Sequence, residues 1–158
     1  MRTQTILVLK ALIAAMIALL AVCQFGVIPA TASGMARAYP EFAWLAVAGI
    51  ILGALFLLCV EVVLVCVWRL LDLVAADRTF TDRAFVWVDV VLGAVALATV
   101  TLAVALGLLS SAHAASPGIA IVCLLGVVVG AGLSLLIVVL RGLLRKASQL
   151  EADLSEVV

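Results

Sequence analysis

Four long stretches of this chain contain no Asp, Glu, Lys or Arg. They run over residues 11–29, 42–60, 90–112 and 114–140. An apolar helix of about 20 residues crosses the roughly 30 Å hydrocarbon core of a bilayer. The chain is 68% hydrophobic and 11% charged, whereas soluble domains are about half apolar and one quarter charged. The pattern predicts four membrane-spanning helices, near residues 5–28, 43–68, 84–109 and 117–141.

The predicted fold class is all-α, an integral membrane four-helix bundle that forms one domain over residues 1–158. Strands of a membrane β-barrel would alternate in polarity over segments of about ten residues, and these stretches are continuously apolar. Pro29, Pro40 and Pro117 fall where the predicted helices stop or start. The spans use most of the length, so residues 142–158 are left as a tail outside the membrane.

The positive charges between the spans predict the orientation. With both termini in the cytoplasm, Arg37 is the single Lys or Arg on the outer side. The eight on the inner side are Arg2, Lys10, Arg69, Arg78, Arg83, Arg141, Arg145 and Lys146. Cytoplasmic loops of membrane proteins carry an excess of Lys and Arg, so both ends are expected to face the cytoplasm.

A cleaved signal peptide is the alternative for the amino terminus. The chain has a basic start, an apolar run from Ala11 and the small residues Ala30, Thr31 and Ala32, which together are typical of such peptides. Cleavage would leave three spans. We expect the segment to be retained as the first span, because the apolar run is long for a signal peptide.

No motif for catalysis, metal binding or cofactor binding is evident, and we expect no enzymatic activity and no cofactor. The cysteines, Cys23, Cys59, Cys66 and Cys123, form no C-x-x-C pair and are expected to be packing residues. A disulfide between Cys23 and Cys123 stays open if the first and last helices meet. The single histidine, His113, is expected in an outer loop.

Three ionisable residues, Lys10, Glu61 and Asp89, fall inside the predicted spans toward their cytoplasmic ends. Charged side chains in a membrane usually face the interior of the protein and find a partner. We expect Lys10 to pair with Glu61. Two interpretations stay open: a cluster that stabilises the bundle, and a proton or cation path that includes Glu61.

Small residues predict where the helices approach closely. Helix association in lipid depends on such close packing, because lipid tails are as apolar as leucine. Gly49 and Gly53 make a G-x-x-x-G step in the second span. The third and fourth spans should form an antiparallel hairpin through Gly93, Ala96, Thr99, Ala103 and Gly107 on one helix and Gly126, Gly130 and Ser134 on the other. We expect contacts within the bundle first and a homodimer second.

The tail is predicted to be an amphipathic helix that continues the fourth span into the cytoplasm. Its apolar seam, which we call the tail seam, steps by three and four residues through Leu143, Ala147, Leu150, Leu154 and Val157. Basic residues lie near the membrane and acidic residues near the end. The tail either folds back on the inner loop or membrane surface, or docks a cytoplasmic protein or a second copy.

The inner loop with Asp77-Arg78-Thr79-Phe80-Thr81 and the ending from Leu140 to Val158 resemble the bacterial domain-of-unknown-function family numbered 2975. Family members have a Leu-Leu-Arg-x-Ala segment and a later Asp-Leu-Asp-Glu-Val-Ile segment. Ser155 stands where the second Asp of the latter would be. The resemblance implies four spans in a bacterial plasma membrane and no assigned activity. It also implies a helix-turn-helix regulator as a conceivable cytoplasmic partner, with no direct contact to nucleic acid.

The leading hypothesis is therefore a non-enzymatic membrane protein with a regulatory, sensory or scaffolding role that acts through its loop and tail. The alternative is a small transporter or permease that uses Glu61 and Lys10. A continuous cavity lined by polar residues would favour transport, whereas a filled bundle with an exposed tail seam would favour partner binding.

Overall fold

The computed structural model describes residues 2–38, 40, 43–75, 82–112 and 117–155. The elements named along these residues are all helical, which confirms the all-α prediction. In chain order they are α1 (Arg2–Val22), the π-helical turn η1 (Cys23–Val27), α2 (Ile28–Ala38), α3 (Ala43–Ala75), α4 (Asp82–Ser111) and α5 (Pro117–Ser155).

Four helical segments are long and apolar enough to cross a membrane, so the predicted number of spans is confirmed. They are Ile6–Ala38, Ala43–Leu73, Val86–Ser111 and Pro117–Leu143. The first was expected to end near residue 28. Instead its helical path continues through η1 and α2 to Ala38. The four apolar helices indicate a membrane protein.

The first span continues past Pro29 because a π-turn precedes this proline. Proline lacks a backbone N–H and its ring crowds the carbonyl four residues earlier, so it ordinarily kinks or ends a helix. In η1 the N–H of Ile28 bonds to the carbonyl of Cys23, five residues back, and the wider turn accommodates Pro29. The Thr31 hydroxyl adds hydrogen bonds to the carbonyls of Val27 at 2.8 Å and Ile28 at 3.0 Å, as hydroxyl side chains do at broken membrane helices.

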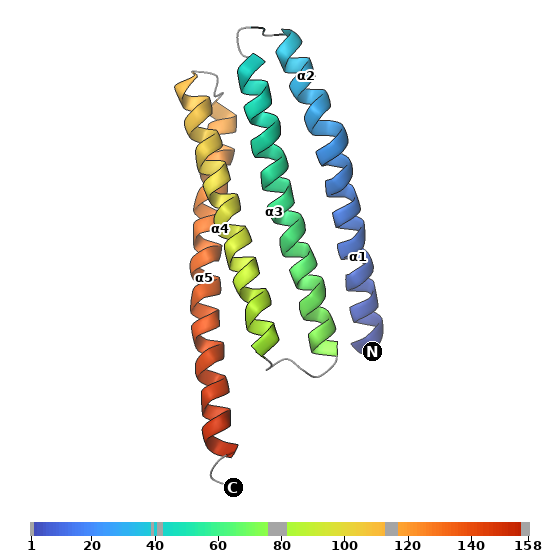
Figure 1. Cartoon of the computed structure of the whole chain (residues 1–158), viewed down its shortest axis with the longest axis vertical. Helices are drawn as coiled ribbons and strands as arrows, with labels where there is room; N and C mark the ends of the chain where they lie inside the picture. Colours follow the sequence, from blue (N-terminus) through green and yellow to red (C-terminus); the bar gives the residue numbers. More distant parts are fainter. Residues whose placement is uncertain (1, 39, 41–42, 76–81, 113–116, 156–158) are drawn as a thin grey trace.

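Figure 1 shows the helices in an open row rather than a closed ring. α1, η1 and α2 pack against α3, α3 packs against α4, and α4 packs against α5. Within the described part of the chain, α5 contacts no helix except α4, and α1 contacts α3 and its own continuation η1. The row therefore has two edges, one made by α1 and α2 and the other by α5.

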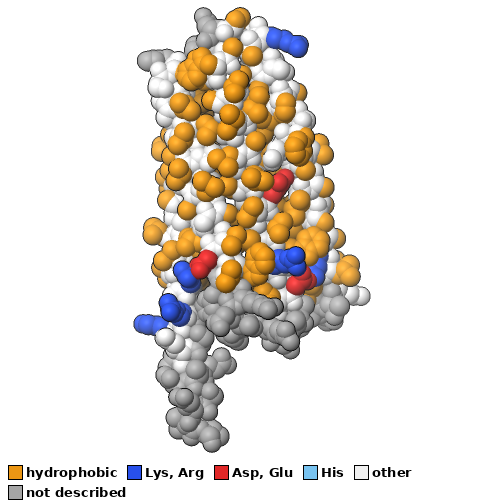
Figure 2. All heavy atoms as spheres, viewed as in Figure 1, with side chains coloured by type: hydrophobic (Ala, Val, Ile, Leu, Met, Phe, Trp, Pro, Cys, Tyr) orange, Lys and Arg blue, Asp and Glu red, His pale blue; other side chains and the backbone are white. Residues whose placement is uncertain are grey.

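The protein core is thin as a result. The buried side chains of the described residues are Ile13, Cys59, Cys66, Ala94 and Thr101. Large apolar side chains cover the outside of the helices instead (Figure 2). In a bilayer this surface meets lipid tails rather than water, so its exposure costs little.

The α4–α5 hairpin is held by close packing at two glycines of α5. A Cβ atom on Gly130 would lie 2.2 Å from the Oγ1 atom of Thr99, and one on Gly126 would lie 2.8 Å from a methyl of Leu102. The Ser134 hydroxyl donates to the Gly130 carbonyl at 2.9 Å. Gly126 and Gly130 therefore lie against α4, as the sequence pattern predicts, whereas the hydrogen bond of Ser134 is within α5.

The other small residues of α4 lie elsewhere. Gly93, Ala96, Ala103 and Gly107 are exposed, and a Cβ atom on Gly93 or Gly107 would meet nothing within 4 Å. Thr99 is thus the member of the predicted α4 face that the structure brings against a glycine of α5. The reason is that a stripe of small residues is wider than one contact line between two helices.

The two glycines of the G-x-x-x-G step in α3 also differ from each other. A Cβ atom on Gly53 would lie 3.3 Å from the side chain of Ile28, so Gly53 lets α2 approach α3. Gly49 has open space where its Cβ would be. Of the two glycines in the G-x-x-x-G step, Gly53 therefore allows a close contact within the chain and Gly49 does not.

We predict that Gly130→Ala weakens the α4–α5 contact by about 1–3 kcal/mol, the usual cost of overpacking, because its new methyl would overlap the Thr99 hydroxyl. Thr99→Ala in the same chain should recover much of that loss. The measurement is reversible unfolding in mixed detergent micelles.

Gly132→Ala is the matched control, because a Cβ atom there meets nothing within 4 Å. It should be neutral or slightly stabilising, since alanine is the better helix former. Equal destabilisation by the two alanine substitutions would contradict the proposed close packing.

Candidate functional site

Charged side chains gather at one end of the row, which we call the charged end. It is the end where α1 begins, α3 ends and α4 begins, toward the bottom of Figures 1 and 2. Two ion pairs between helices lie there. The Lys10 ammonium pairs with the Asp72 carboxylate, and Arg141 Nη2 donates to Asp89 Oδ2 at 2.7 Å.

The predicted pairing of Lys10 with Glu61 is not the one found, since Lys10 pairs with Asp72. The cause lies in the lengths of the helices. α3 continues to Ala75, beyond the predicted end near residue 68, so an acidic residue further along α3 comes level with Lys10. Glu61 is eleven residues before Asp72, about 16 Å along the axis at 1.5 Å per residue.

The two ion pairs tie neighbouring helices together. Lys10–Asp72 joins α1 to α3 with side chains 28% and 44% exposed, and Arg141–Asp89 joins α5 to α4 with both side chains 43% exposed. Partly exposed pairs contribute about 1 kcal/mol or less. Their main effect is to fix how the joined helices are aligned along their axes. A shift of one helix would leave a charge unpaired at this depth, which would be costly.

Asp89 has a second oxygen to satisfy. Its Oδ1 atom is buried and has no hydrogen-bond partner among the described residues, while Oδ2 accepts from Arg141. Sequence reasoning identified Asp89 but not Arg141 as its partner. The antiparallel hairpin that it did predict is the signal that would have suggested this pair.

Two further polar side chains lie far from the charged end. Glu61 in α3 and Gln24 in η1 are both half-buried, and the Oε1 atom of Gln24 is buried with no hydrogen-bond partner among the described residues. Sequence reasoning passed over Gln24. Its signal is that it is the one amide side chain in the apolar run of residues 11–29.

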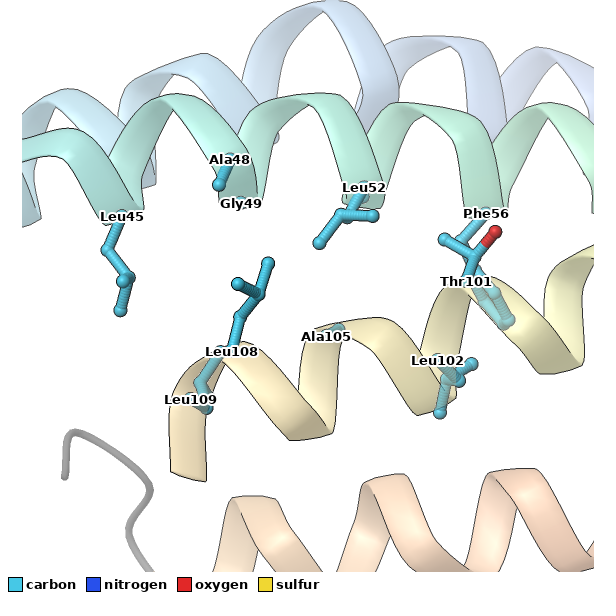
Figure 3. A pocket seen from close by; sticks show the side chains of 11 residues that line it. Leu45, Ala48, Gly49, Leu52, Phe56, Thr101, Leu102, Ala105, Leu108 and Leu109 are labelled. Atoms are coloured by element: carbon cyan, nitrogen blue, oxygen red, sulfur yellow. The ribbon is translucent and has the colours of Figure 1, made fainter. Parts of the chain in front are cut away.

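An apolar cavity of about 250 Å³ lies between α3 and α4 at the end opposite the charged end. Leu108 extends toward α3 between Leu45 and Leu52, and Gly49 and Ala105 leave space beside it (Figure 3). Thr101 supplies a hydroxyl, which donates to the Leu97 carbonyl of its own helix at 2.8 Å. The lining is therefore suited to a hydrocarbon chain rather than to a polar substrate.

A second cavity, of about 340 Å³, lies at the charged end and is lined by Val65, Trp68, Arg69 and Asp72. It adjoins the Lys10–Asp72 pair. In the described part of the chain, no group of three His, Cys, Asp or Glu side chains could hold a metal ion.

The four cysteines are free thiols. Cys59 and Cys66 are buried, in keeping with a packing role. Cys23 is in η1 and Cys123 is in α5, on helices that make no contact in the described part of the chain. The open row therefore does not bring together the partners of the disulfide considered above.

The tail forms one continuous helix with the fourth span, since α5 runs from Pro117 to Ser155. Leu143 of the tail seam is 59% exposed. The side chains of Ala147, Leu150 and Leu154 lie outside the described ones, as do His113 and Val157 altogether.

A double-mutant cycle tests the register of α1 against α3. We predict a coupling energy of about 0.5–1 kcal/mol between Lys10→Met and Asp72→Asn, because these side chains form a partly exposed ion pair. Unfolding of each variant in mixed micelles gives the coupling.

The control cycle combines Lys10→Met with Glu61→Gln, which should act independently. A coupling of Lys10 with Glu61 as large as that with Asp72 would contradict the register described here.

Comparison with known proteins gives one match. The family model described as protein of unknown function (DUF2975) matches residues 30–158, a segment that includes α3, α4 and α5. No curated protein and no solved structure matches the chain. Lys10 and Gln24 precede the matched segment. Because the match covers most of the chain, the resemblance seen in the inner loop and the tail is confirmed, and the protein belongs to the DUF2975 family of proteins of unknown function.

Proposed function

We propose that this protein is a non-enzymatic multi-pass membrane protein that presents the end of α5 to a cytoplasmic protein. The observation that carries the proposal is the length of α5. The apolar span ends at Leu143, yet the helix continues to Ser155. Twelve more residues extend a helix by about 18 Å, far enough to leave the membrane and meet a soluble partner.

The Arg141–Asp89 pair supports a projecting tail. It places Arg141 level with Asp89, which is seven residues from the start of α4 at Asp82. α5 continues fourteen residues beyond Arg141, so its last seven residues, about 10 Å, extend past the described start of α4. In Figure 1 the C-terminal end of α5 projects beyond the other helices.

The chemistry of the tail suggests the kind of partner. The tail seam steps as one face of a helix, and Glu151, Asp153 and Glu156 lie off that face. An apolar groove with basic residues at its rim would accept such a helix, in the manner of other helix-in-groove complexes. The positive-inside bias puts the tail in the cytoplasm. The family resemblance makes a helix-turn-helix regulator the first candidate to test.

A transporter that uses Glu61 and Lys10 has less support. The cavity between α3 and α4 has an apolar lining, and Lys10 is paired with Asp72, about 16 Å from Glu61 along α3. These observations favour partner binding over transport.

Charges on the tail seam should abolish docking. We predict that Leu150→Asp with Leu154→Asp lowers recovery of a bound helix-turn-helix regulator at least tenfold, because carboxylates would enter an apolar contact. The measurement is affinity capture of the full-length protein from solubilised membranes, with the regulator quantified by mass spectrometry.

The matched control adds the same two charges to another face of the tail, as Gln149→Asp with Ala152→Asp, and should keep the partner. Equal recovery of the regulator with the seam variant, the control variant and a chain lacking residues 147–158 would refute docking through the tail.

A further inference from the structure

The register of the first span against α3 brings Gln24 and Glu61 to within about one helical turn of each other along the helix axes. Two contacts fix the register of these antiparallel helices. Lys10 pairs with Asp72, and Ile28 packs where a Gly53 side chain would be. In antiparallel helices the numbers of two facing residues have a nearly constant sum. That sum is 82 for the Lys10–Asp72 contact and 81 for the Ile28–Gly53 contact. By this register Glu61 lies level with residues 20–21, and Gln24 is within about one helical turn of it.

Both side chains belong to the faces that meet. Asp72 and Glu61 are eleven residues apart, which is close to three full turns, so they share one face of α3. On the other helix, Lys10, Ile13, Ile17, Leu20, Gln24 and Ile28 step by three or four residues, and each is buried or half-buried. The helix that covers this face is α3, so Gln24 faces α3.

The site is deep in the span. The apolar span of α3 runs from Ala43 to Leu73, and Glu61 is three residues from its midpoint at residue 58. That offset corresponds to about 4–5 Å. Water cannot supply hydrogen bonds at this depth. The two side chains must therefore supply hydrogen bonds to each other, or the carboxylate must bind a proton that removes its charge.

The nearest charged groups do not neutralise Glu61. In this contact they are Lys10 and Asp72, which pair with each other about 16 Å away. Arg69 is exposed and eight residues along α3, about 12 Å. On the other side of α3, Asp89 of α4 pairs with Arg141 of α5. The thiols of Cys23, Cys59 and Cys66 are the other titratable groups of η1 and α3.

We propose that Gln24 and Glu61 form a proton-binding site inside the membrane. One proton taken from water binds the Glu61 carboxylate, and the resulting carboxylic acid donates a hydrogen bond to Gln24 Oε1, the buried acceptor that has no partner. Release of the proton to water leaves an unpaired carboxylate in the contact and weakens the packing of α1 and η1 against α3. The ligand is the proton itself, and its uptake joins the two helices.

The π-turn has a specific part in this site. η1 spans Cys23–Val27, so Gln24 lies within the segment where the helix is widened. Single π-turns in α-helices recur at functional sites. Here the turn that carries Gln24 itself contacts α3.

Infrared spectroscopy of the full-length protein in phosphatidylcholine vesicles tests the site. We expect a carboxylic-acid carbonyl band at neutral pH that disappears in Glu61→Gln. In Gln24→Leu the band should persist but shift to higher wavenumber, because the acid loses its acceptor. Gln4→Leu, which changes an exposed amide in α1, is the matched control and should leave the band unchanged.

Absence of an acid band that depends on Glu61 would overturn the proposal, and so would a band that Gln24→Leu does not shift. A change confined to the carboxylate bands would also overturn it, since the amide N–H of Gln24 would then be donating to an ionised Glu61. Thermal unfolding gives a second measurement. The wild type should lose stability as the pH rises and the proton is released, whereas Glu61→Gln should unfold independently of pH over that range.

Discussion

Lipid tails compete with protein for every apolar side chain in this molecule. In water, the hydrophobic effect would drive α1, α3, α4 and α5 together, but in hydrocarbon it provides almost no net attraction between helices. Association then depends on surfaces that fit more closely than lipid can and on polar groups that lipid cannot satisfy. Gly130 against Thr99 is a contact of the first kind, and Lys10 with Asp72 is one of the second.

This dependence accounts for the open row. A row needs three helix contacts, whereas a closed ring needs a fourth, between α5 and the first span. Each observed contact has a closely packed or polar element of its own. Between the first span and α3 these are Lys10–Asp72 and Ile28–Gly53, and between α4 and α5 they are Gly130–Thr99 and Asp89–Arg141. Between α3 and α4 it is the buried Thr101, which lines the cavity there. The described residues at the two edges are mostly exposed aliphatic side chains, which lipid covers equally well.

Much of this fold could be predicted from charge alone, because charged residues are excluded from the hydrocarbon and so mark the spans. The number of spans and the helical fold class followed from the charge-free runs. The partner of Lys10 could not be predicted in this way, because it depends on how two helices are aligned along their axes. Since α3 extends to Ala75, a different acidic residue is level with Lys10. The end of the first span was also predicted wrongly. Pro29 suggested that the helix stops there, but the π-turn before it lets the helical path continue.

Candidate site residues were harder to predict than the fold. Glu61 and Asp89 stand out in an apolar sequence because they are charged. Gln24 is uncharged, so its sequence signal is weaker, and the burial of its Oε1 atom is what draws attention to it. The tail seam could be recognised from its spacing, and the structure adds that its helix is continuous with the fourth span. The open order of the helices could not be read from the sequence, because exposed and buried leucines look alike in a span that is apolar all round.

The spans on the two sides of the α3–α4 contact differ in length. Those of the first pair comprise 33 and 31 residues, and those of the second pair 26 and 27. At 1.5 Å per residue this is a difference of about 6–10 Å. One bilayer has one thickness, so the longer pair must tilt or bend more than the shorter pair, or the bilayer must thicken around it. Because the row is open, the two hairpins can take different tilts by moving at the single α3–α4 contact, beside the cavity. Membrane thickness thereby becomes a mechanical variable that acts on the angle between the two halves of the molecule.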